Sequence, residues 1–345
     1  MSRRLVALLG LALALSACGA GTPIVAPAPS ATPLRSDQTN PASRTPFLVS
    51  LTPTITALPA SPTPVPPTPT QTPIPCDPVK GYCIENGHFY FDRPIALPGT
   101  ITIDRGYPYG TTEGGTREPH HGVEFYNASG TPVLAAADGV VAVAGNDSQT
   151  IYAVHTNSYG NLIVLEHHFP GIDEAVYTVY GHLSKVEVQV GQTVRAGDEI
   201  GKVGATGAAI GSHLHFEVRL GQNTYDSNRN PVLWLKPLDG ADGTQFGALA
   251  GRLVDAQGNP LHVTDMNIQY FPDRNGPQAA AYQMETYAPE AHPVRSDDTW
   301  NENFAMSDIP AGNYRISKIW GGRLYEDWIV VEPGKVTFFV FQIGQ

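Results

Sequence analysis

Three short motifs offer the side chains of a transition-metal site, namely His120, His182, His213, His215 and Glu124. The motifs are HHGVE at 120–124, YGH at 180–182 and SHLHFE at 212–217. Residues two apart in a β-strand point to the same face, so we expect His213 and His215 to aim two imidazoles into one cleft. One further histidine or carboxylate nearby would complete a three-ligand zinc site with a position open for water, which is the catalytic type.

Around these motifs, the segment from about Gly106 to Lys236 resembles the lysostaphin/LytM-type zinc metallopeptidases, which cut peptide bonds in bacterial cell-wall peptidoglycan. The matching pieces are 117–125, 130–141, 179–184, 190–194, 197–207 and 211–219. Several motifs occur in the family's order, and the segment that contains them makes up a little over a third of the chain. The resemblance implies Zn²⁺ as the cofactor and the peptide cross-links of peptidoglycan as the substrate.

The resemblance also implies a role for each residue of the motifs. It has Zn²⁺ held by His120, Glu124 and His215. It places His182 and His213 beside the metal, facing the substrate. Glu124 departs from the family, which has Asp at this position. Glutamate is an accepted zinc ligand, but its extra methylene requires the strand to sit slightly farther back or the coordination to change.

The two remaining histidines are the candidates for proton transfer. The His-Glu-x-x-His motif that would supply a glutamate base is absent from this sequence. Histidine is the natural substitute, because its free pKa lies near neutrality. We therefore predict that His182 and His213 act as general base or acid and as the group that stabilises the oxyanion. The sequence leaves open which histidine has which role.

Two neighbours of these residues have alternative interpretations. A shift of register by one residue would make His121, rather than His120, the metal ligand. Glu217 lies one strand step beyond His215 on the same face. It either orients a metal ligand from behind or makes a surface ion pair.

The elements that must position these residues are strands. Short β-rich runs at 139–144, 161–167, 175–180, 185–190 and 213–219 are separated by turn residues about every ten positions. No segment shows a long helical period, so the pattern predicts an all-β domain of antiparallel strands. The glycines of 197–211 do not form a phosphate loop, because Gly201-Lys202 is followed by Val203. We expect the loops 147–160 and 169–175 to determine which bond is cut.

Two further β-rich stretches flank this segment. Residues 76–104 read as a lead-in with short strands at 89–91 and 100–103, so we predict a peptidase domain over 76–243. The stretch 247–345 has the strand spacing of a small β-sandwich. It is similar to carboxypeptidase-regulatory-like modules, and we expect it to be a structural or wall-binding accessory.

The first residues predict export. Arg3-Arg4 precede an apolar run, Leu5–Leu15, which is too short to span a bilayer. The run ends in Leu-Ser-Ala-Cys, which looks like a bacterial lipobox and implies a signal peptide over 1–18 with lipidation of Cys18. The alternative is an ordinary secretory signal. The Pro/Thr-rich stretch 19–75 cannot bury enough apolar surface to fold, and it predicts a disordered tether. The chain would then be anchored to the outer face of the cell membrane, with its catalytic domain facing the wall.

The other two cysteines predict a disulfide. Cys76 and Cys83 can close a short loop, and disulfides persist in exported proteins. A metal pair is the alternative, but no third or fourth cysteine is left to complete such a site.

Composition and motifs exclude several classes of protein. The 345 residues carry a formal net charge of -11, and no basic run follows Arg3-Arg4, which argues against nucleic acid as a partner. All three cysteines lie outside the histidine-rich segment, which excludes a Cys–His peptidase. Ser212 lacks the Gly-x-Ser-x-Gly context of a serine hydrolase. The sequence implies neither a monomer nor a dimer.

Two non-enzymatic interpretations remain. Some proteins of this fold have lost metal ligands and activate other wall hydrolases, but this chain keeps all four histidines. The other non-enzymatic interpretation is a wall-anchored binding protein in which the sandwich is the part that binds. Metal binding separates the enzyme from the regulator.

Overall fold

The computed structural model of the chain describes residues 76–240, 242–289 and 294–344. The predicted signal peptide with Cys18 and the tether 19–75 lie outside the described residues. The described residues form one compact unit. Its ordered elements are strands, apart from the two short 3₁₀ turns Tyr225–Ser227 and Pro231–Leu233. None of the helices within the described ranges has the length and apolar character needed to cross a membrane.

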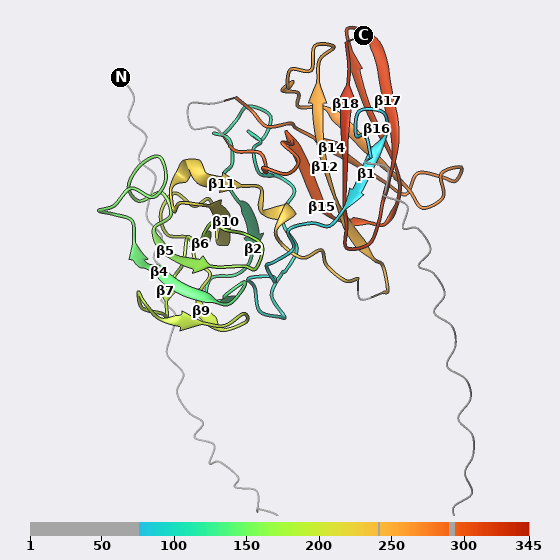
Figure 1. Cartoon of the computed structure of the whole chain (residues 1–345). Coiled ribbons are helices and arrows are strands. Elements are labelled where there is room, and N and C mark those ends of the chain that lie inside the picture. Colours follow the sequence, from blue (N-terminus) through green and yellow to red (C-terminus); the bar gives the residue numbers. More distant parts are fainter. Residues whose placement is uncertain (1–75, 241, 290–293, 345) are drawn as a thin grey trace, which may run out of the picture. The chain divides into compact units, whose positions relative to one another are not determined.

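A seven-stranded sheet carries the histidine motifs (Figure 1). Its strands run in the order β11-β10-β6-β5-β4-β8, and β2 pairs with β10 beside β11. They are β2 (Val123–Tyr126), β4 (Gly139–Asn146), β5 (Asn161–His167), β6 (Val176–Gly181), β8 (Thr193–Val194), β10 (His213–Leu220) and β11 (Asn228–Arg229). A second, three-stranded sheet consists of β3 (Pro132–Leu134), β9 (Glu199–Lys202) and β7 (Lys185–Val186). All pairs in these two sheets are antiparallel, as predicted.

The central strand β10 divides its residues between a core face and a polar face. Leu214, Phe216 and Val218 belong to the apolar core. The alternate residues, His213 to Arg219, are also buried, and they face the cleft side. Because successive side chains in a strand point to opposite faces, one strand anchors the fold and carries the chemistry at the same time.

The C-terminal module is a sandwich of two four-stranded sheets, as predicted. One sheet has the order β1-β18-β12-β15 and the other β14-β13-β16-β17. The strands are β1 (Tyr82–Glu85), β12 (Phe246–Val254), β13 (Met266–Phe271), β14 (Ala280–Met284), β15 (Phe304–Pro310), β16 (Gly312–Trp320), β17 (Arg323–Val331) and β18 (Val336–Gln342). One pair, β12 with β18, is parallel.

One sheet of the sandwich has apolar residues on both faces. Leu249 and Phe339 pack into the core of the sandwich. Ala250, Val336 and Phe338 belong instead to the core of the histidine-bearing module. The two modules therefore share this sheet as a packing surface and do not simply follow one another along the chain.

The lead-in differs from the sequence expectation. Strand β1 pairs with β18 and so extends the sandwich sheet. The stretch 89–91 forms only an isolated bridge from Phe91 to Leu235, and 100–103 is not a strand. Pro94 and Pro98 lie between these two runs, and proline has no backbone N–H to donate to the hydrogen bonds of a sheet. The segment therefore packs on the core as coil.

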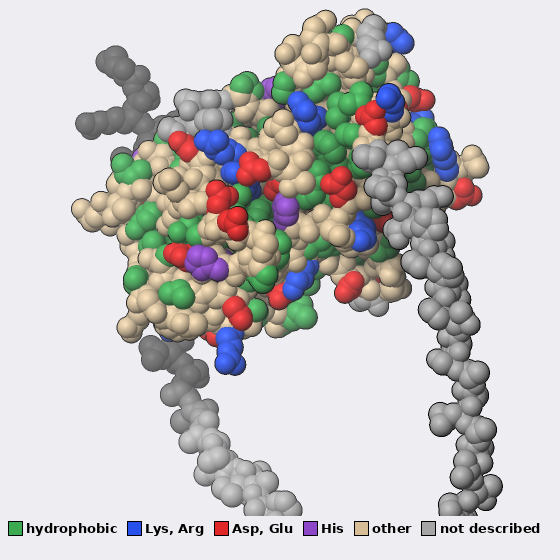
Figure 2. Space-filling model, viewed as in Figure 1, with side chains coloured by type: hydrophobic (Ala, Val, Ile, Leu, Met, Phe, Trp, Pro, Cys, Tyr) green, Lys and Arg blue, Asp and Glu red, His purple; other side chains and the backbone are tan. Residues whose placement is uncertain are grey.

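A disulfide joins Cys76 to the buried Cys83 of β1. This is the pairing that the sequence predicts, and it leaves no thiolate for the alternative metal site. On the face shown in Figure 2, Lys and Arg side chains lie scattered among acidic ones and do not gather in one patch.

Candidate metal centre and active site

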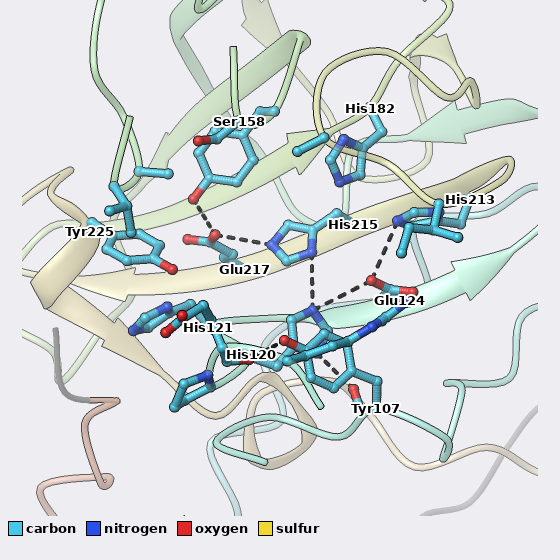
Figure 3. Close-up of a pocket in the computed structure, with 18 of the residues that line it drawn as sticks. Tyr107, His120, His121, Glu124, Ser158, His182, His213, His215, Glu217 and Tyr225 are labelled. Atoms are coloured by element: carbon cyan, nitrogen blue, oxygen red, sulfur yellow. Dashed lines mark hydrogen bonds and ion pairs between the residues drawn. The ribbon is translucent and has the colours of Figure 1, made fainter. Parts of the chain in front are cut away.

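The three predicted ligands converge at the point where β2 and β10 pair. In the register of these strands Glu124 lies directly opposite His215, and directly opposed residues place their side chains close together on one face. His120 lies three residues before the first residue of β2. His120, Glu124 and His215 each offer one ligand atom, and these atoms lie within 4.8 Å of one another (Figure 3).

A backbone hydrogen bond fixes the orientation of the His120 ring. Its Nδ1 lies 2.7 Å from the backbone oxygen of Tyr107. Because a carbonyl can only accept, Nδ1 carries the proton and Nε2 keeps its lone pair. That Nε2 lies 3.2 Å from Nδ1 of His215 and 3.6 Å from Oε1 of Glu124. The Tyr107 ring stacks on His120 at 4.2 Å between centroids. Burial, then the neighbouring His215, lowers the pKa of His120 to about 3, so the imidazole is neutral and able to bind a cation.

The ring of His215 is oriented by a buried ion pair. Its Nε2 lies 3.0 Å from Oε1 of Glu217, and Oε2 of Glu217 accepts from Nε of Arg219 at 2.8 Å. Tyr159 donates its hydroxyl to Glu217 and accepts from Arg219 at 2.8 Å. Burial alone would raise the pKa of Glu217, but Arg219 and His215 hold it well below its usual range. The carboxylate therefore fixes the His215 proton on Nε2 and leaves Nδ1 for the metal.

His182 and His213 lie together on the other side of the ligand cluster. Their ring centroids are 4.8 Å apart, and His182 is 5.6 Å from His215 by the same measure. His182 has a φ of 62°, in the left-handed region that non-glycine residues rarely adopt, and its Nδ1 lies 2.8 Å from the backbone oxygen of Thr206. Burial, then the neighbouring histidines, lowers the pKa of His182 to about 3. Nε2 of His213 lies 3.4 Å from Oε1 of Glu124.

The donor set fits a divalent cation. Two neutral imidazole nitrogens and a carboxylate oxygen point to a common position, as in a three-ligand zinc site. Oε2 of Glu124 is buried and has no hydrogen-bond partner among the described residues. A bound cation would compensate a buried carboxylate of this kind. The extra methylene of Glu124 therefore does not prevent convergence.

The geometry also decides between the alternatives that the sequence left open. His120, rather than His121, belongs to the ligand cluster. His121 lines the cleft, with its ring centroid 3.8 Å from that of Tyr225. Glu217 orients His215 and is fully buried, so it makes no surface ion pair.

The ligand cluster lies at the floor of a cleft of about 630 Å³. Loop 115–119 lines the cleft, and so do 153–155 with 158–159, Ala208 and Ile210. The predicted determinant loop 147–160 therefore contributes, whereas the loop 169–175 is not part of this lining. Phe169 instead stacks on Tyr90, so this loop is held in the apolar packing beneath the lead-in.

Several residues of the site are not among those that the sequence motifs single out. They are Tyr107, Arg117, Tyr159, Arg219 and Tyr225. Arg219 could have been found, because it continues the two-residue period of His213, His215 and Glu217. The other four stand in loops or a short turn, where no periodicity marks them.

Known proteins share this histidine-bearing region. Residues 118–227 match the model of Peptidase family M23. The cell division protein DipM of Caulobacter vibrioides is 35% identical over 127 residues, which are 37% of this chain and 18% of DipM. The peptidoglycan DD-endopeptidase ShyB of Vibrio cholerae is 36% identical over 182 residues, which are 49% of this chain and 39% of ShyB.

A solved structure covers the same region. The catalytic domain of lysostaphin from Staphylococcus simulans is 33% identical over 37% of this chain and 89% of that one, with a TM-score of 0.32. The chain spans well under half the length of the two curated relatives named above. The match to the family model covers all the histidine motifs, and the chain therefore contains a peptidase family M23 domain of the lysostaphin/LytM type.

Proposed function

We propose that this chain is a zinc-dependent endopeptidase that hydrolyses peptide bonds of bacterial cell-wall peptidoglycan. The observation that carries the proposal is the convergence of Nε2 of His120, Oε1 of Glu124 and Nδ1 of His215 at the floor of an open cleft. The names of two relatives support the substrate. ShyB is a peptidoglycan DD-endopeptidase, and Mpg of Neisseria meningitidis, 36% identical over 132 residues, is a DD-carboxypeptidase/endopeptidase.

In this proposal His120, Glu124 and His215 hold the metal. When bound there, Zn²⁺ supplies Lewis acidity toward a peptide carbonyl and makes water more acidic. The protein's own residues supply the remaining steps. Because the backbone oxygen of Thr206 holds the proton of His182 on Nδ1, Nε2 is free to accept a proton from the attacking water. Burial keeps this imidazole neutral near pH 7.

His213 is the second participant. Its Nδ1 lies 3.2 Å from the backbone oxygen of Gly211 and its Nε2 lies 3.4 Å from Oε1 of Glu124. Because both oxygens accept, the imidazolium form carries a proton on each nitrogen, and the proton on Nε2 can be donated to the oxyanion that forms at the scissile carbonyl. His182 as base and His213 as donor is thus the division of labour that we propose.

The place of action is part of the same proposal. Lipidation of Cys18 would anchor the chain at the outer face of the membrane, and the Pro/Thr-rich stretch 19–75 would span the distance to the wall. Replacement of Cys18 by Ala should release the protein into the medium. Membrane retention of that variant at the parent level would refute the anchor.

A regulator that activates another hydrolase is the alternative. Glu124, which stands where the family has Asp, is the observation that favours it. Incubation of the purified protein with intact peptidoglycan separates the two. An enzyme releases new amino groups, loses this activity with a chelator and regains it with zinc. A regulator releases none, with or without zinc, in the absence of a partner hydrolase.

A further inference from the structure

One wall of the cleft is a loop that a residue of the C-terminal module holds in place. The loop, Thr112–Glu118, contains three consecutive residues in the left-handed region, Glu113, Gly114 and Gly115, with φ of 52°, 69° and 88°. Such a conformation persists only where its surroundings fix it. Residues 115–118 of this loop line the cleft.

Glu285, which follows β14, supplies that support. Its Oε1 accepts from the backbone N of Thr112 at 2.9 Å and from the Thr112 hydroxyl at 2.5 Å. Its Oε2 accepts from the backbone N of Gly114 at 3.1 Å. The Glu285 side chain is only 8% exposed, and His262 lies beside it at 3.2 Å. Burial alone would raise the pKa of Glu285, but these hydrogen bonds hold it below its usual range. The ionised carboxylate therefore binds both ends of the tight turn.

The same loop places the positively charged side chain of Arg117 at the cleft. Its Nε pairs with Oε2 of Glu113 at 2.9 Å, and its guanidinium lies 4.6 Å above the ring of Tyr107. Tyr107 in turn stacks on His120. Arg117, Tyr107 and His120 therefore form one stack, which ends at a proposed metal ligand. Because Glu113 engages Nε, the two terminal nitrogens form the fork that Arg117 presents. Arginine remains charged at every accessible pH, and such a fork matches the geometry of a carboxylate.

Apolar side chains line other parts of the same cleft. Val154 is 52% exposed, Ile210 is 70% exposed and Tyr126 is 42% exposed, although all three line the cleft. Exposed apolar groups in a cleft are suited to a ligand that carries side chains. A bridge made only of glycine has neither side-chain carbon nor a carboxylate to offer these walls.

We propose that Arg117 binds a carboxylate of the wall peptide next to the bond that is cut, and that Glu285 is the positioning residue for the loop that carries Arg117. This inference rests on the proposed endopeptidase function and narrows its substrate to peptides with a free carboxylate beside the scissile bond. Glu113 and the exposed Glu118 stand in the same loop. Recognition therefore depends on the directed fork of Arg117 and not on an excess of positive charge.

The experiment compares two cross-linked muropeptides that differ only in one group, a free carboxylate or its carboxamide, beside the scissile bond. We expect the full-length zinc-loaded protein to cut the carboxylate form with a kcat/KM about tenfold higher, the equivalent of one strong charged contact. Arg117→Ala should abolish this preference, mainly through a higher KM for the carboxylate form. Arg117→Lys, which keeps the charge and loses the fork, should retain only part of the preference.

Glu285→Gln tests the positioning role against a matched control. It should reduce the preference toward that of Arg117→Ala at unchanged metal content. Glu326→Gln, the same substitution on the exposed strand β17 of the same module, should leave the preference intact. The inference is overturned if Arg117→Ala slows both muropeptides equally, or if the parent does not distinguish them.

A failure of the proposed function gives a different result. If the parent cuts neither muropeptide, calorimetric titration of the same two compounds replaces the kinetic comparison. Tighter binding of the carboxylate form that Arg117→Ala abolishes would retain the recognition site in a protein that is not an endopeptidase. Equal binding of both forms would refute the recognition site as well.

Discussion

The floor and the walls of the cleft are built in different ways. The floor consists of adjacent strands, β2 and β10, whose register alone places Glu124 opposite His215. The walls are loops, and buried carboxylates fix them, one from within the loop 147–160 and one from the C-terminal module. Asp147 accepts from the backbone N of Tyr159 at 2.7 Å, and Glu285 holds Thr112 and Gly114.

The difference separates two demands on the site. Metal binding and proton transfer need atoms fixed to a fraction of an ångström, which strands provide. Selection of a substrate needs surfaces that vary from protein to protein, which loops provide. We therefore expect substitutions in the floor to change the reaction and substitutions in the walls to change only the choice of substrate.

The largest effect that tests this division is expected for His182. The substitution His182→Ala removes the proposed base without touching a ligand, so kcat should fall by about 10²–10⁴-fold while the metal content stays at that of the parent. Cleavage kinetics and metal analysis of the same preparation check both parts. A kcat within threefold of the parent would remove His182 from the mechanism.

Glu217 tests whether the floor depends on groups behind the ligands. In Glu217→Gln the His215 tautomer is no longer enforced, and Arg219 is left buried beside a neutral amide. Metal affinity should weaken about 10–100-fold, as measured by competition with a chromophoric chelator. Glu166→Gln, on strand β5 of the same sheet and with its side chain 37% exposed, is the control. Equal affinities for both variants would contradict the role of Glu217.

The floor could be predicted from the sequence because its information is local. The spacing of His213, His215 and Glu217 follows the two-residue period of a strand, and the His120–Glu124 motif lies at the start of another. The orientations of the His120 and His182 rings could not be predicted. They depend on the backbone oxygens of Tyr107 and Thr206, which no side-chain pattern reveals.

The walls could not be predicted, because their contacts are distant in the sequence. Thr112 and Glu285 are separated by 173 positions, and only the folded sandwich brings them together. The same reason explains the place of β1. A short strand pairs with whichever sheet edge the fold leaves open, and here that edge belongs to β18.

A buried carboxylate of the C-terminal module offers a contrast with Glu217. Glu302 accepts from the Tyr287 hydroxyl and from the backbone N of Asp297, both at 2.8 Å. Burial, then the charge of Asp297, raises its pKa from 4.5 to about 8. Beside Glu217, by contrast, the positive charge of Arg219 lowers the pKa of the carboxyl group. Glu217 and Glu302 are thus kept in opposite ionisation states at neutral pH.

Linkage gives the sign of the resulting pH dependence. Between pH 4.5 and about 8 the unfolded chain releases the Glu302 proton, whereas the folded chain keeps it. The stabilisation is therefore complete below pH 4.5 and is lost as the pH rises toward 8, by about 1.4 kcal/mol per pH unit. In Glu302→Gln the free energy of unfolding should fall less steeply over this range in urea titrations. Parallel curves for parent and variant would contradict the raised pKa.

The smallest effect is expected for the exchange Glu124→Asp, which restores the family's residue. The shorter side chain draws the carboxylate back from a point where Oε1 lies 3.6 Å from Nε2 of His120. Because β2 is held in register by four residue pairs with β10, the backbone should not follow, and metal affinity should fall a fewfold. A large gain in affinity and activity would show that Glu124 weakens the site and would favour the regulator.

If His120, Glu124 and His215 form a working metal centre, the number of metal ions bound per chain should depend on them. The purified mature protein, incubated with zinc and dialysed, should retain about one ion per chain, as expected for one three-ligand site. His215→Ala should retain essentially none, and Arg117→Ala, a wall substitution, should match the parent. A parent that stays free of metal, or a His215→Ala variant that binds as much as the parent, would contradict the account.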